Sequence, residues 1–154
     1  MKITLLVPTL NEVIGMRAIM PLVDRTVVDQ ILVLDGGSTD GTIEYAREAG
    51  YDVWVQKKKG LINGYREVYP MIRGEAVITF SPDGNSVPEV IGDLAAKLRE
   101  GADMVIASRY LGNAKSDDDT MITGWGNWVF TTLINVLFGG KYTDAMVIFR
   151  GYRT

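Results

Sequence analysis

Residues 30–42 read QILVLDGGSTDGT, and this stretch decides the fold. The apolar run Gln30–Leu34 predicts a buried strand, which stops at Asp35 and the two glycines after it. Thr42–Ala49 then has the spacing of a helix, and Gly50 is its stop signal. A strand that leads through a polar turn into a helix is the repeating unit of α/β proteins.

The same unit recurs along the whole chain. Further strands are predicted over residues 3–7, 51–56, 75–80, 102–107 and 144–149, and further helices over residues 13–23, 61–72, 88–99 and 125–138. Strands that alternate with helices form a mostly parallel central sheet with helices on both faces. A length of 154 residues fits one domain. We therefore expect a single Rossmann-like α/β domain over residues 1–154.

Composition excludes several kinds of chemistry. The chain has no cysteine and no histidine, which rules out disulfides, Ser-His triads and histidine metal sites. With a net charge of −3, no overall positive field attracts nucleic acid. The N-terminal apolar run is too short for a signal peptide, and Trp128–Phe138 is shorter than the about 20 residues of a membrane span. Because a chain without cysteine is stable in either redox setting, these features leave the compartment open. We expect a cytoplasmic protein that could also lie on the cytoplasmic face of a membrane.

Polar clusters follow four of the predicted strands. They are Pro8–Glu12, Asp35–Asp40, Ser81–Asn85 and Ser108–Arg109. In open α/β sheets, ligands bind outside the carboxyl ends of the strands, so we expect the four clusters to line one site. Asp35 could accept hydrogen bonds from a base or a ribose; the alternative is an ordinary turn in which Asp40 or Ser38 caps the next helix.

A metal site is one interpretation of Ser81-Pro82-Asp83-Gly84-Asn85. The oxygen-bearing side chains stand at alternating positions, and Mg²⁺ or Mn²⁺ prefers oxygen ligands, to which a diphosphate could add. A plain proline-glycine turn is the alternative.

Basic residues offer phosphate contacts. Lys57–Lys59 could neutralise phosphate or form a solvated surface. Arg109 and Arg150 stand at predicted strand ends, where each could fork onto phosphate oxygens or form a surface ion pair. Asp117–Asp119 leaves the same choice between a functional and a solvated charge run. The aromatic residues Trp125, Trp128 and Phe130 are expected in the core, and a platform for lipid is the alternative.

Five stretches, taken together, resemble the family 2 glycosyltransferases with the GT-A fold. They are VPTLNE (Val7–Glu12), LDGGSTDGT (Leu34–Thr42), FSPDGNSVPE (Phe80–Glu89), ASRY (Ala107–Tyr110) and TDAMVIFRGYR (Thr143–Arg153). Their order and separations match the family over nearly the whole chain, and the likeness is greatest to the dolichol- or polyprenyl-phosphate mannosyltransferase-like branch. Many relatives continue into further helices, some of them transmembrane, so the resemblance implies a catalytic domain that is truncated at its C-terminal end.

The resemblance implies a donor site and a metal site. The nucleotide-sugar contacts would come from Pro8, Thr9, Glu12, Asp35, Gly37, Ser38, Lys59 and Asp83. Asp83 would match the last aspartate of the family's DxD motif and hold Mg²⁺ or Mn²⁺ with the diphosphate, and Asn85 would be a further ligand. Ser81 stands where the family has the first aspartate, so the metal site has one carboxylate fewer. Gly36 replaces the second aspartate of the usual DDGS turn.

The implied reaction is inverting transfer of a sugar from a nucleoside diphosphate sugar to a lipid phosphate or a saccharide. Arg109 and Arg150 would meet donor or acceptor phosphates, and the helix over residues 125–138 would border the acceptor groove. Asp144 would act as the base for a hydroxyl acceptor, whereas a phosphate acceptor is already ionised and needs none.

Two rival functions remain at this stage. Because Ser81 weakens the metal site, the chain could be a catalytically weak or inactive nucleotide-sugar-binding module. A nucleotidyltransferase is the other rival, but it would carry a glycine-rich basic loop after the first strand, where this chain has Pro8–Glu12.

Overall fold

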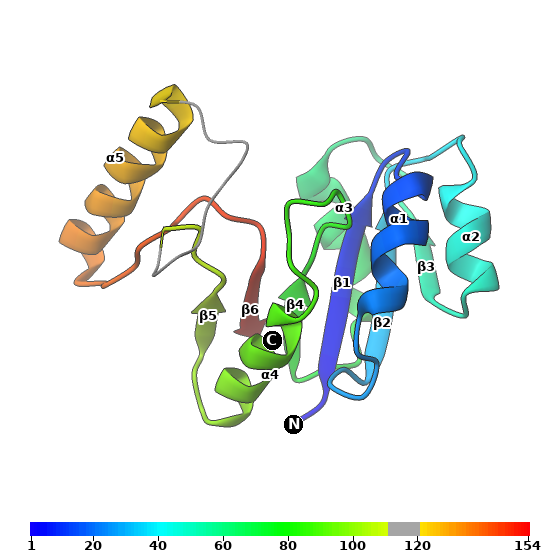
Figure 1. The fold of residues 1–154 in the computed structure, drawn as a ribbon, viewed down its shortest axis with the longest axis horizontal. Helices are drawn as coiled ribbons and strands as arrows, with labels where there is room; N and C mark the ends of the chain where they lie inside the picture. The colour runs from blue at the N-terminus through cyan, green and yellow to red at the C-terminus, as the bar shows by residue number, and fades with distance from the viewer. Residues whose placement is uncertain (111–120) are drawn as a thin grey trace.

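A six-stranded sheet forms the centre of the protein, in a computed structural model that describes residues 1–110 and 121–154 (Figure 1). The strands lie in the order β3-β2-β1-β4-β6-β5. Their bounds are β1 Ile3–Thr9, β2 Gln30–Asp35, β3 Asp52–Val55, β4 Ala76–Thr79, β5 Met104–Ile106 and β6 Arg150–Arg153. β1 to β4 pair in parallel, and β6 lies antiparallel between β4 and β5. The predicted mostly parallel α/β sheet is confirmed.

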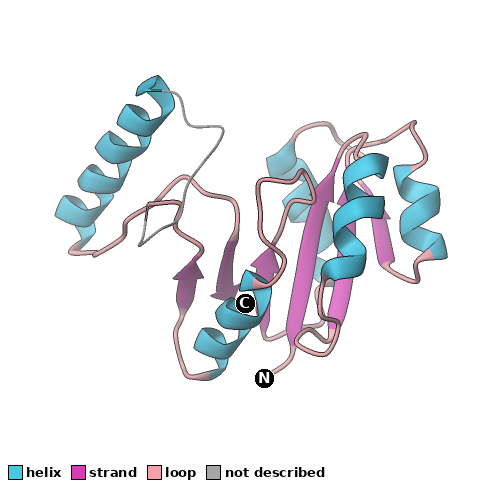
Figure 2. Cartoon of the chain, in the orientation of Figure 1, coloured by secondary structure: helices cyan, strands magenta, loops and turns pink. Residues whose placement is uncertain are grey.

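Helices connect the strands, as Figure 2 shows. They are α1 Val13–Ile19, α2 Thr42–Glu48, α3 Leu61–Val68, α4 Val90–Arg99 and α5 Met121–Phe138, with 3₁₀ turns η1 Met20–Leu22 and η2 Tyr69–Met71. The helices predicted over residues 13–23 and 61–72 both end earlier than expected. Each passes into a 3₁₀ turn that contains a proline, Pro21 or Pro70, because proline cannot donate the next helical hydrogen bond.

Alternate residues of β1 face the two sides of the sheet. Ile3, Leu5 and Val7 pack in one cluster with residues of α1, α2 and α4. Leu6 packs on the opposite face with Val68 of α3. In Figure 1, α1, α2 and α4 accordingly lie in front of the sheet and α3 lies behind it. The expectation of helices on both faces is confirmed.

The strand predicted over residues 144–149 is wrong. This stretch is irregular, and β6 begins at the residue that follows it, Arg150. The reason is local: Asp144 Oδ1 accepts hydrogen bonds from the backbone N–H groups of Met146 and Val147, at 3.3 and 3.2 Å. These bonds fold the chain back on Asp144 and take the backbone out of the extended conformation that a sheet requires.

The loops after β1 and β2 are tied to each other. Asn11, whose φ of 55° is positive, donates its backbone N–H to Ser38 Oγ and accepts from Thr39 N through Oδ1. Asp40 accepts from the first backbone N–H of α1, at Val13, and of α2, at Thr42. Asp40, one of the two residues considered as a helix cap, thus contacts the first residue of both helices, so these two loops form one unit at the carboxyl edge of the sheet.

The expectation that Trp125, Trp128 and Phe130 lie in the core is wrong. These side chains of α5 are 67%, 64% and 54% exposed. α5 stands away from the sheet in Figure 1 and presents a different stripe, Asn127 and Thr131, to the protein. The buried hydroxyl of Thr131 accepts from Ala145 N, and Asn127 Oδ1 accepts from Met146 N. The acidic run Asp117–Asp119 lies outside the described residues.

Candidate active site

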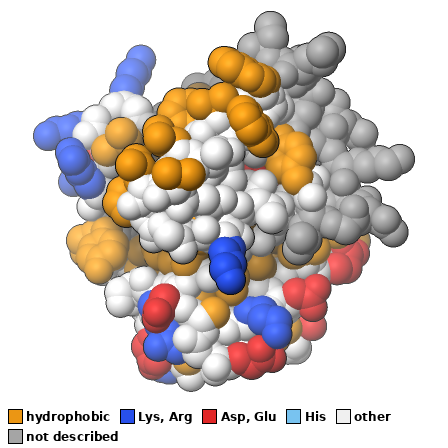
Figure 3. Space-filling model, turned by 90° about the vertical axis from the view of Figure 1, so that its left-hand side faces the viewer, with side chains coloured by type: hydrophobic (Ala, Val, Ile, Leu, Met, Phe, Trp, Pro, Cys, Tyr) orange, Lys and Arg blue, Asp and Glu red, His pale blue; other side chains and the backbone are white. Residues whose placement is uncertain are grey.

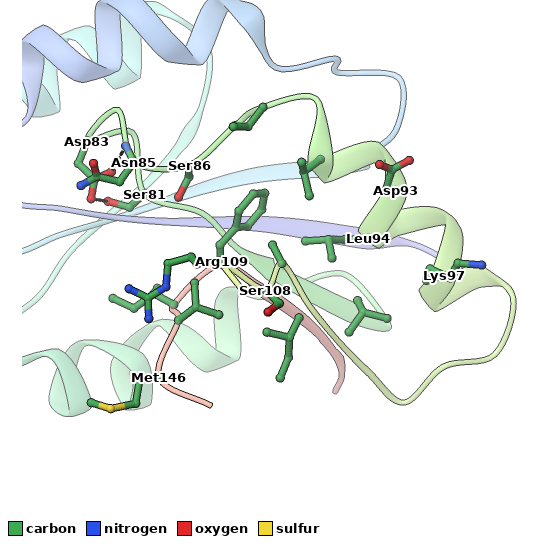
Figure 4. Close-up of a pocket in the computed structure, with 18 residues that line it drawn as sticks. Ser81, Asp83, Asn85, Ser86, Asp93, Leu94, Lys97, Ser108, Arg109 and Met146 are labelled. Carbon is green, nitrogen blue, oxygen red and sulfur yellow. Dashed lines mark hydrogen bonds between the residues drawn. The ribbon is translucent and has the colours of Figure 1, made fainter. Parts of the chain in front are cut away.

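A cavity of about 890 Å³ opens at the carboxyl edge of β4 and β5. Its walls come from the loop after β4, from α4, from the end of β5 and from residues 146–149 (Figure 4). Asp83 and Arg109 lie at one end of the cavity, and Asp93 and Lys97 of α4 lie at the other. Between these polar ends the lining is apolar, so charged ligand groups are expected at the two ends.

Asp83 organises the turn that carries the predicted metal ligands. Its Oδ2 accepts from Ser81 Oγ at 2.9 Å, and its Oδ1 accepts from the backbone N–H of Asn85 at 3.0 Å. The three side chains lie together at the cavity, as Figure 4 shows. One carboxylate with a hydroxyl and an amide oxygen suits a hard divalent cation, provided that a diphosphate supplies further oxygens. Within residues 1–110 and 121–154, no three carboxylates gather as a ready-made metal site.

Arg109 is fixed by Asp144 on the cavity wall. The guanidinium Nε lies 2.8 Å from Asp144 Oδ2, and Nη2 lies 3.2 Å from Oδ1. Asp144 is completely buried, while the Arg109 side chain is 29% exposed. This two-point contact fixes the plane of the guanidinium on the cavity wall. This ion pair thus holds the end of β5 against the segment that precedes β6.

The geometry speaks against Asp144 as a general base. Burial alone would raise the pKa of Asp144, but the side-chain and backbone hydrogen bonds from Arg109, together with its charge, lower that pKa below the ordinary value of 3.8. A base works best with a pKa near the working pH. Both Asp144 oxygens are also engaged. In this structure Asp144 supports Arg109, and its expected role as a base stays a prediction.

Asp35 does not face the cavity that Asp83 and Arg109 share. The expectation of one common hollow is wrong for this residue, because Asp35 is 0% exposed. Its carboxylate accepts from Thr9 Oγ1, from the backbone N–H of Gly37 and from both N and Oγ of Ser38. Asp35 thus holds together the loop that was expected to contact the nucleoside. Of the remaining predicted donor contacts, Pro8 and Glu12 lie half-buried beside this loop.

Arg150 does not line the cavity that Arg109 faces, and its expected contact with a donor or acceptor phosphate stays a prediction. Its side chain donates to the carbonyl oxygens of Val147 and Ala145, because the turn at Asp144 leaves these carbonyls unpaired in the sheet. Arg150 instead lines a smaller cavity of about 240 Å³ with Tyr65 and Tyr152. Burial raises the pKa of both tyrosines, which remain neutral donors at physiological pH.

The basic loop Lys57–Lys59 follows β3 at the same sheet edge as the Asp35 loop. Gln56 N donates to Asp35 O at 2.9 Å, which joins the two loops. Glu67 of α3 accepts from the backbone N–H groups of Lys57 and Lys58 at 2.7 and 2.9 Å. Sequence reasoning missed Glu67, since nothing in a single sequence shows that a helical carboxylate reaches back to a loop nine residues earlier. It also missed the cavity residues Ser86, Asp93 and Lys97, whereas Ser108 of the expected cluster Ser108–Arg109 does line the cavity.

The family model for glycosyl transferase family 2 matches residues 4–154. The chain belongs to this family. Among characterised family 2 relatives, it is 30% identical over 152 residues to glycosyltransferase AglJ of Haloferax volcanii, covering 98% of this chain and 49% of AglJ. It is 29% identical over 126 residues to the dolichol-phosphate mannosyltransferase of Pyrococcus furiosus, covering 77% of this chain and 36% of that enzyme. The chain thus spans at most about half the length of these relatives.

A solved structure confirms the GT-A fold of this family 2 chain. Glucosyl-3-phosphoglycerate synthase from Mycobacterium tuberculosis, in complex with Mn²⁺, UDP and phosphoglyceric acid, aligns with a TM-score of 0.75 at 22% identity. The alignment covers 99% of this chain and 55% of the synthase. The family and the polyprenyl-phosphate-like branch expected from the quoted stretches are confirmed.

Proposed function

We propose that the chain transfers a hexose, with inversion, from a nucleoside diphosphate sugar to a phosphate-bearing acceptor such as a polyprenyl phosphate. The observation that carries the proposal is that Asp83 and Arg109, 26 residues apart in the printed sequence, face one cavity at the carboxyl edge of the sheet. In the reaction, negative charge develops on the departing diphosphate. A carboxylate that can hold a cation suits this reaction, and so does a guanidinium that is fixed in place.

The proposed reaction involves two parts of the donor, the anomeric carbon of its sugar and its diphosphate. The acceptor oxygen would attack the anomeric carbon of the sugar while the bond from that carbon to the diphosphate breaks, and the electron pair leaves with the diphosphate. Ser81, Asp83 and Asn85 would hold a Mg²⁺ or Mn²⁺, which supplies a Lewis acid for the diphosphate oxygens. Arg109 would stabilise phosphate charge from the opposite wall.

A phosphate acceptor is favoured because the structure offers Asp144 as a support and not as a base. A phosphate oxygen is ionised at neutral pH and attacks without losing a proton, whereas a hydroxyl requires a base. Relatives support the choice: one is named as a dolichol-phosphate mannosyltransferase, and one is solved with phosphoglyceric acid.

Turnover with a defined donor and acceptor tests the proposal. The protein would be incubated with Mn²⁺, UDP-glucose or GDP-mannose, and a short polyprenyl phosphate, and the glycolipid and released nucleotide would be quantified. We expect both products in equal amounts. Binding of the nucleotide without either product would favour the rival function, a binding module weakened by Ser81. Asp83→Asn should abolish turnover, and Asp103→Asn, whose carboxylate is exposed outside the cavity, is the matched carboxylate control.

We also infer that the outer face of α5 lies on a lipid surface, which would bring the site to a lipid acceptor. α5 has no charged residue over Met121–Phe138. It turns Asn127 and Thr131 inward and leaves large apolar side chains exposed, among them Val136 and Phe138 at 75% and 80%. An outward apolar face with tryptophan among its residues is typical of interfacial helices. The described helices include none that could span a bilayer.

The described charges that follow α5 suit an anionic lipid surface, whereas the acidic run Asp117–Asp119 just before α5 lies outside the described residues. Over the described residues 121–154, Asp144 is the one acidic side chain, and it is buried against Arg109. Lys141, just after α5, is exposed. On the side of the molecule that carries α5, shown in Figure 3, apolar side chains gather in the upper half beside Lys and Arg side chains, and acidic side chains lie mainly below. Positive charge beside an apolar face is attracted to anionic headgroups.

A further inference from the structure

Glu67 holds the basic loop in place through the backbone and leaves the lysine side chains out of the contact. Its carboxylate accepts from the N–H groups of Lys57 and Lys58 and, at 3.3 Å, from Trp54 Nε1. The hydrogen bond from Lys57, supported by that from Lys58, lowers the pKa of Glu67 although burial opposes it. The carboxylate is therefore ionised at neutral pH, and its charge is directed at backbone amides.

The residues that follow Lys58 are also held in place by local contacts. Lys59 O accepts from Asn63 Nδ2 at 2.8 Å, and Gly60 has a φ of 103° that only glycine adopts readily. Gly64 packs closely below the loop, since an added Cβ would lie 3.2 Å from Leu34 Cδ2 and would displace the Gln56 side chain. A loop of three consecutive lysines is thus held in one backbone conformation, which is unusual for a charge run whose sole task is solvation.

The three lysines differ in their surroundings. Lys57 Nζ lies over the Trp54 ring, 5.5 Å from its centroid, which occupies this ammonium in a cation–π contact. Lys58 and Lys59 are exposed and stand next to the two anchored points of the loop. Since Gln56 N donates to Asp35 O, the loop that carries Lys58 and Lys59 lies at the same edge of the sheet as the Asp35 loop.

We propose that Glu67 is a positioning residue for the donor, which fixes the loop so that Lys58 and Lys59 meet the diphosphate while Lys57 stays on Trp54. This inference rests on the proposed function, because it requires a diphosphate donor. Preorganisation lowers the entropy that ligand binding must remove from two long side chains. Lysine ammonium groups bind phosphate as point charges, so their benefit grows with the number of phosphates on the ligand.

Glu67→Gln is the most informative substitution, because it changes the hydrogen bonding of the side chain and hardly changes its shape. The glutamine side chain would offer one acceptor oxygen, and its NH₂ group would face a backbone N–H, which also donates. In the Glu67→Gln variant, the loop should therefore lose at least one of its two anchoring bonds. Glu67→Asp is a second variant that keeps the charge but is too short to reach both amides. Glu48→Gln, on the exposed last turn of α2, is the matched control for loss of a carboxylate.

Calorimetry with Mn²⁺ and a ladder of ligands tests the role. UDP and GDP would be compared with UMP and GMP, and with uridine and guanosine. We expect Glu67→Gln to weaken the diphosphate by about tenfold and the monophosphate less, with the nucleoside unchanged, because only phosphates meet the lysines. In a protein that already carries Lys58→Ala and Lys59→Ala, Glu67→Gln should have little further effect.

The outcomes separate this inference from the function on which it rests. Equal weakening of nucleoside and diphosphate would show a merely structural role and overturn the inference. So would diphosphate affinity within twofold of the wild type in both Glu67 variants. Wild-type protein that binds neither UDP nor GDP would overturn the proposed function itself and this inference with it. Urea unfolding of each variant establishes that the compared proteins are folded.

Discussion

Asp144 and Arg109 form a two-point ion pair between a completely buried carboxylate and a guanidinium that remains partly exposed on the cavity wall. We expect Asp144→Asn to destabilise the protein by roughly 2–4 kcal/mol, since a buried pair that loses one partner leaves an uncompensated charge. Urea unfolding measures this loss. Thr132→Ala, on exposed α5 surface, is a control, and equal stability of Asp144→Asn and the wild type would contradict the assigned support role.

The same pair predicts how stability depends on pH. The folded-state pKa of Asp144 lies below 3.8, so its contribution is present above that pH and is lost as the pH falls through the folded pKa. The unfolding free energy of the wild type should therefore exceed that of Asp144→Asn at pH 7, and the difference should shrink below pH 3.8. A difference that stays constant down to acid unfolding would show that the ion pair is not its source.

Ser81→Asp restores a second carboxylate beside Asp83. Because Ser81 Oγ already lies 2.9 Å from Asp83 Oδ2, we expect about tenfold tighter Mn²⁺ binding in the presence of UDP. Without metal, the two like charges should lower the stability. Calorimetry and thermal unfolding with and without Mn²⁺ measure both effects, and Ser86→Asp, also on the cavity lining, is the matched control. Unchanged Mn²⁺ affinity would argue against a metal at this turn.

Gly15 of α1 lies against the turn that carries Asp83. A Cβ at Gly15 would lie 2.0 Å from the carbonyl oxygen of Pro82, so Gly15→Ala must displace backbone and should cost about 2 kcal/mol. Gly92→Ala in α4 is the control, because nothing lies within 4 Å of its added Cβ. That variant should gain about 0.5–1 kcal/mol of stability, as alanine favours a helix. Equal effects at both glycines would disprove the close contact.

Two tryptophans on α5 report directly on lipid contact. In a Trp54→Phe variant, the emission comes from Trp125 and Trp128, both about two-thirds exposed. We expect a shift to shorter wavelength with phosphatidylglycerol vesicles and a smaller one with phosphatidylcholine. Trp125→Ser with Trp128→Ser should reduce vesicle co-sedimentation. An emission maximum that is unchanged by both kinds of vesicle would overturn the membrane assignment. So would gel filtration that shows self-association, because a second copy would then cover the apolar face.

Patterns of apolar residues predicted the fold well. Strand and helix order followed from runs such as Gln30–Leu34, because a parallel sheet buries both faces and its strands are apolar throughout. The error at residues 144–149 arose because the apolar run Met146–Phe149 is compatible both with a strand and with an irregular segment that lines the cavity. The carboxylate of Asp144 decides between them by binding backbone N–H groups, and a periodicity argument contains no such contact.

The site was predictable only in part: of the four clusters expected to line one site, Ser81–Asn85 and Ser108–Arg109 contribute to the cavity, whereas no residue of Pro8–Glu12 or Asp35–Asp40 lines it. Asp83 and Arg109 do share a cavity, since strand ends meet at one edge. Asp35 and Arg150 point elsewhere, because each finds backbone partners close in sequence. The exposure of α5 was missed for a related reason: its apolar composition suggested the core, whereas the inward face is set by Asn127 and Thr131 and their bonds to residues 145 and 146.

The position of β6 has a consequence for how the molecule is made. In the part of the chain that the structure describes, β5 pairs with β6 alone, yet β6 is synthesised more than 40 residues after β5. A nascent chain can thus complete the β3-β2-β1-β4 platform while β5 still has no strand to join. Ribosome-bound intermediates should therefore have a protease-resistant N-terminal part, and the wall that carries Arg109 should become resistant last.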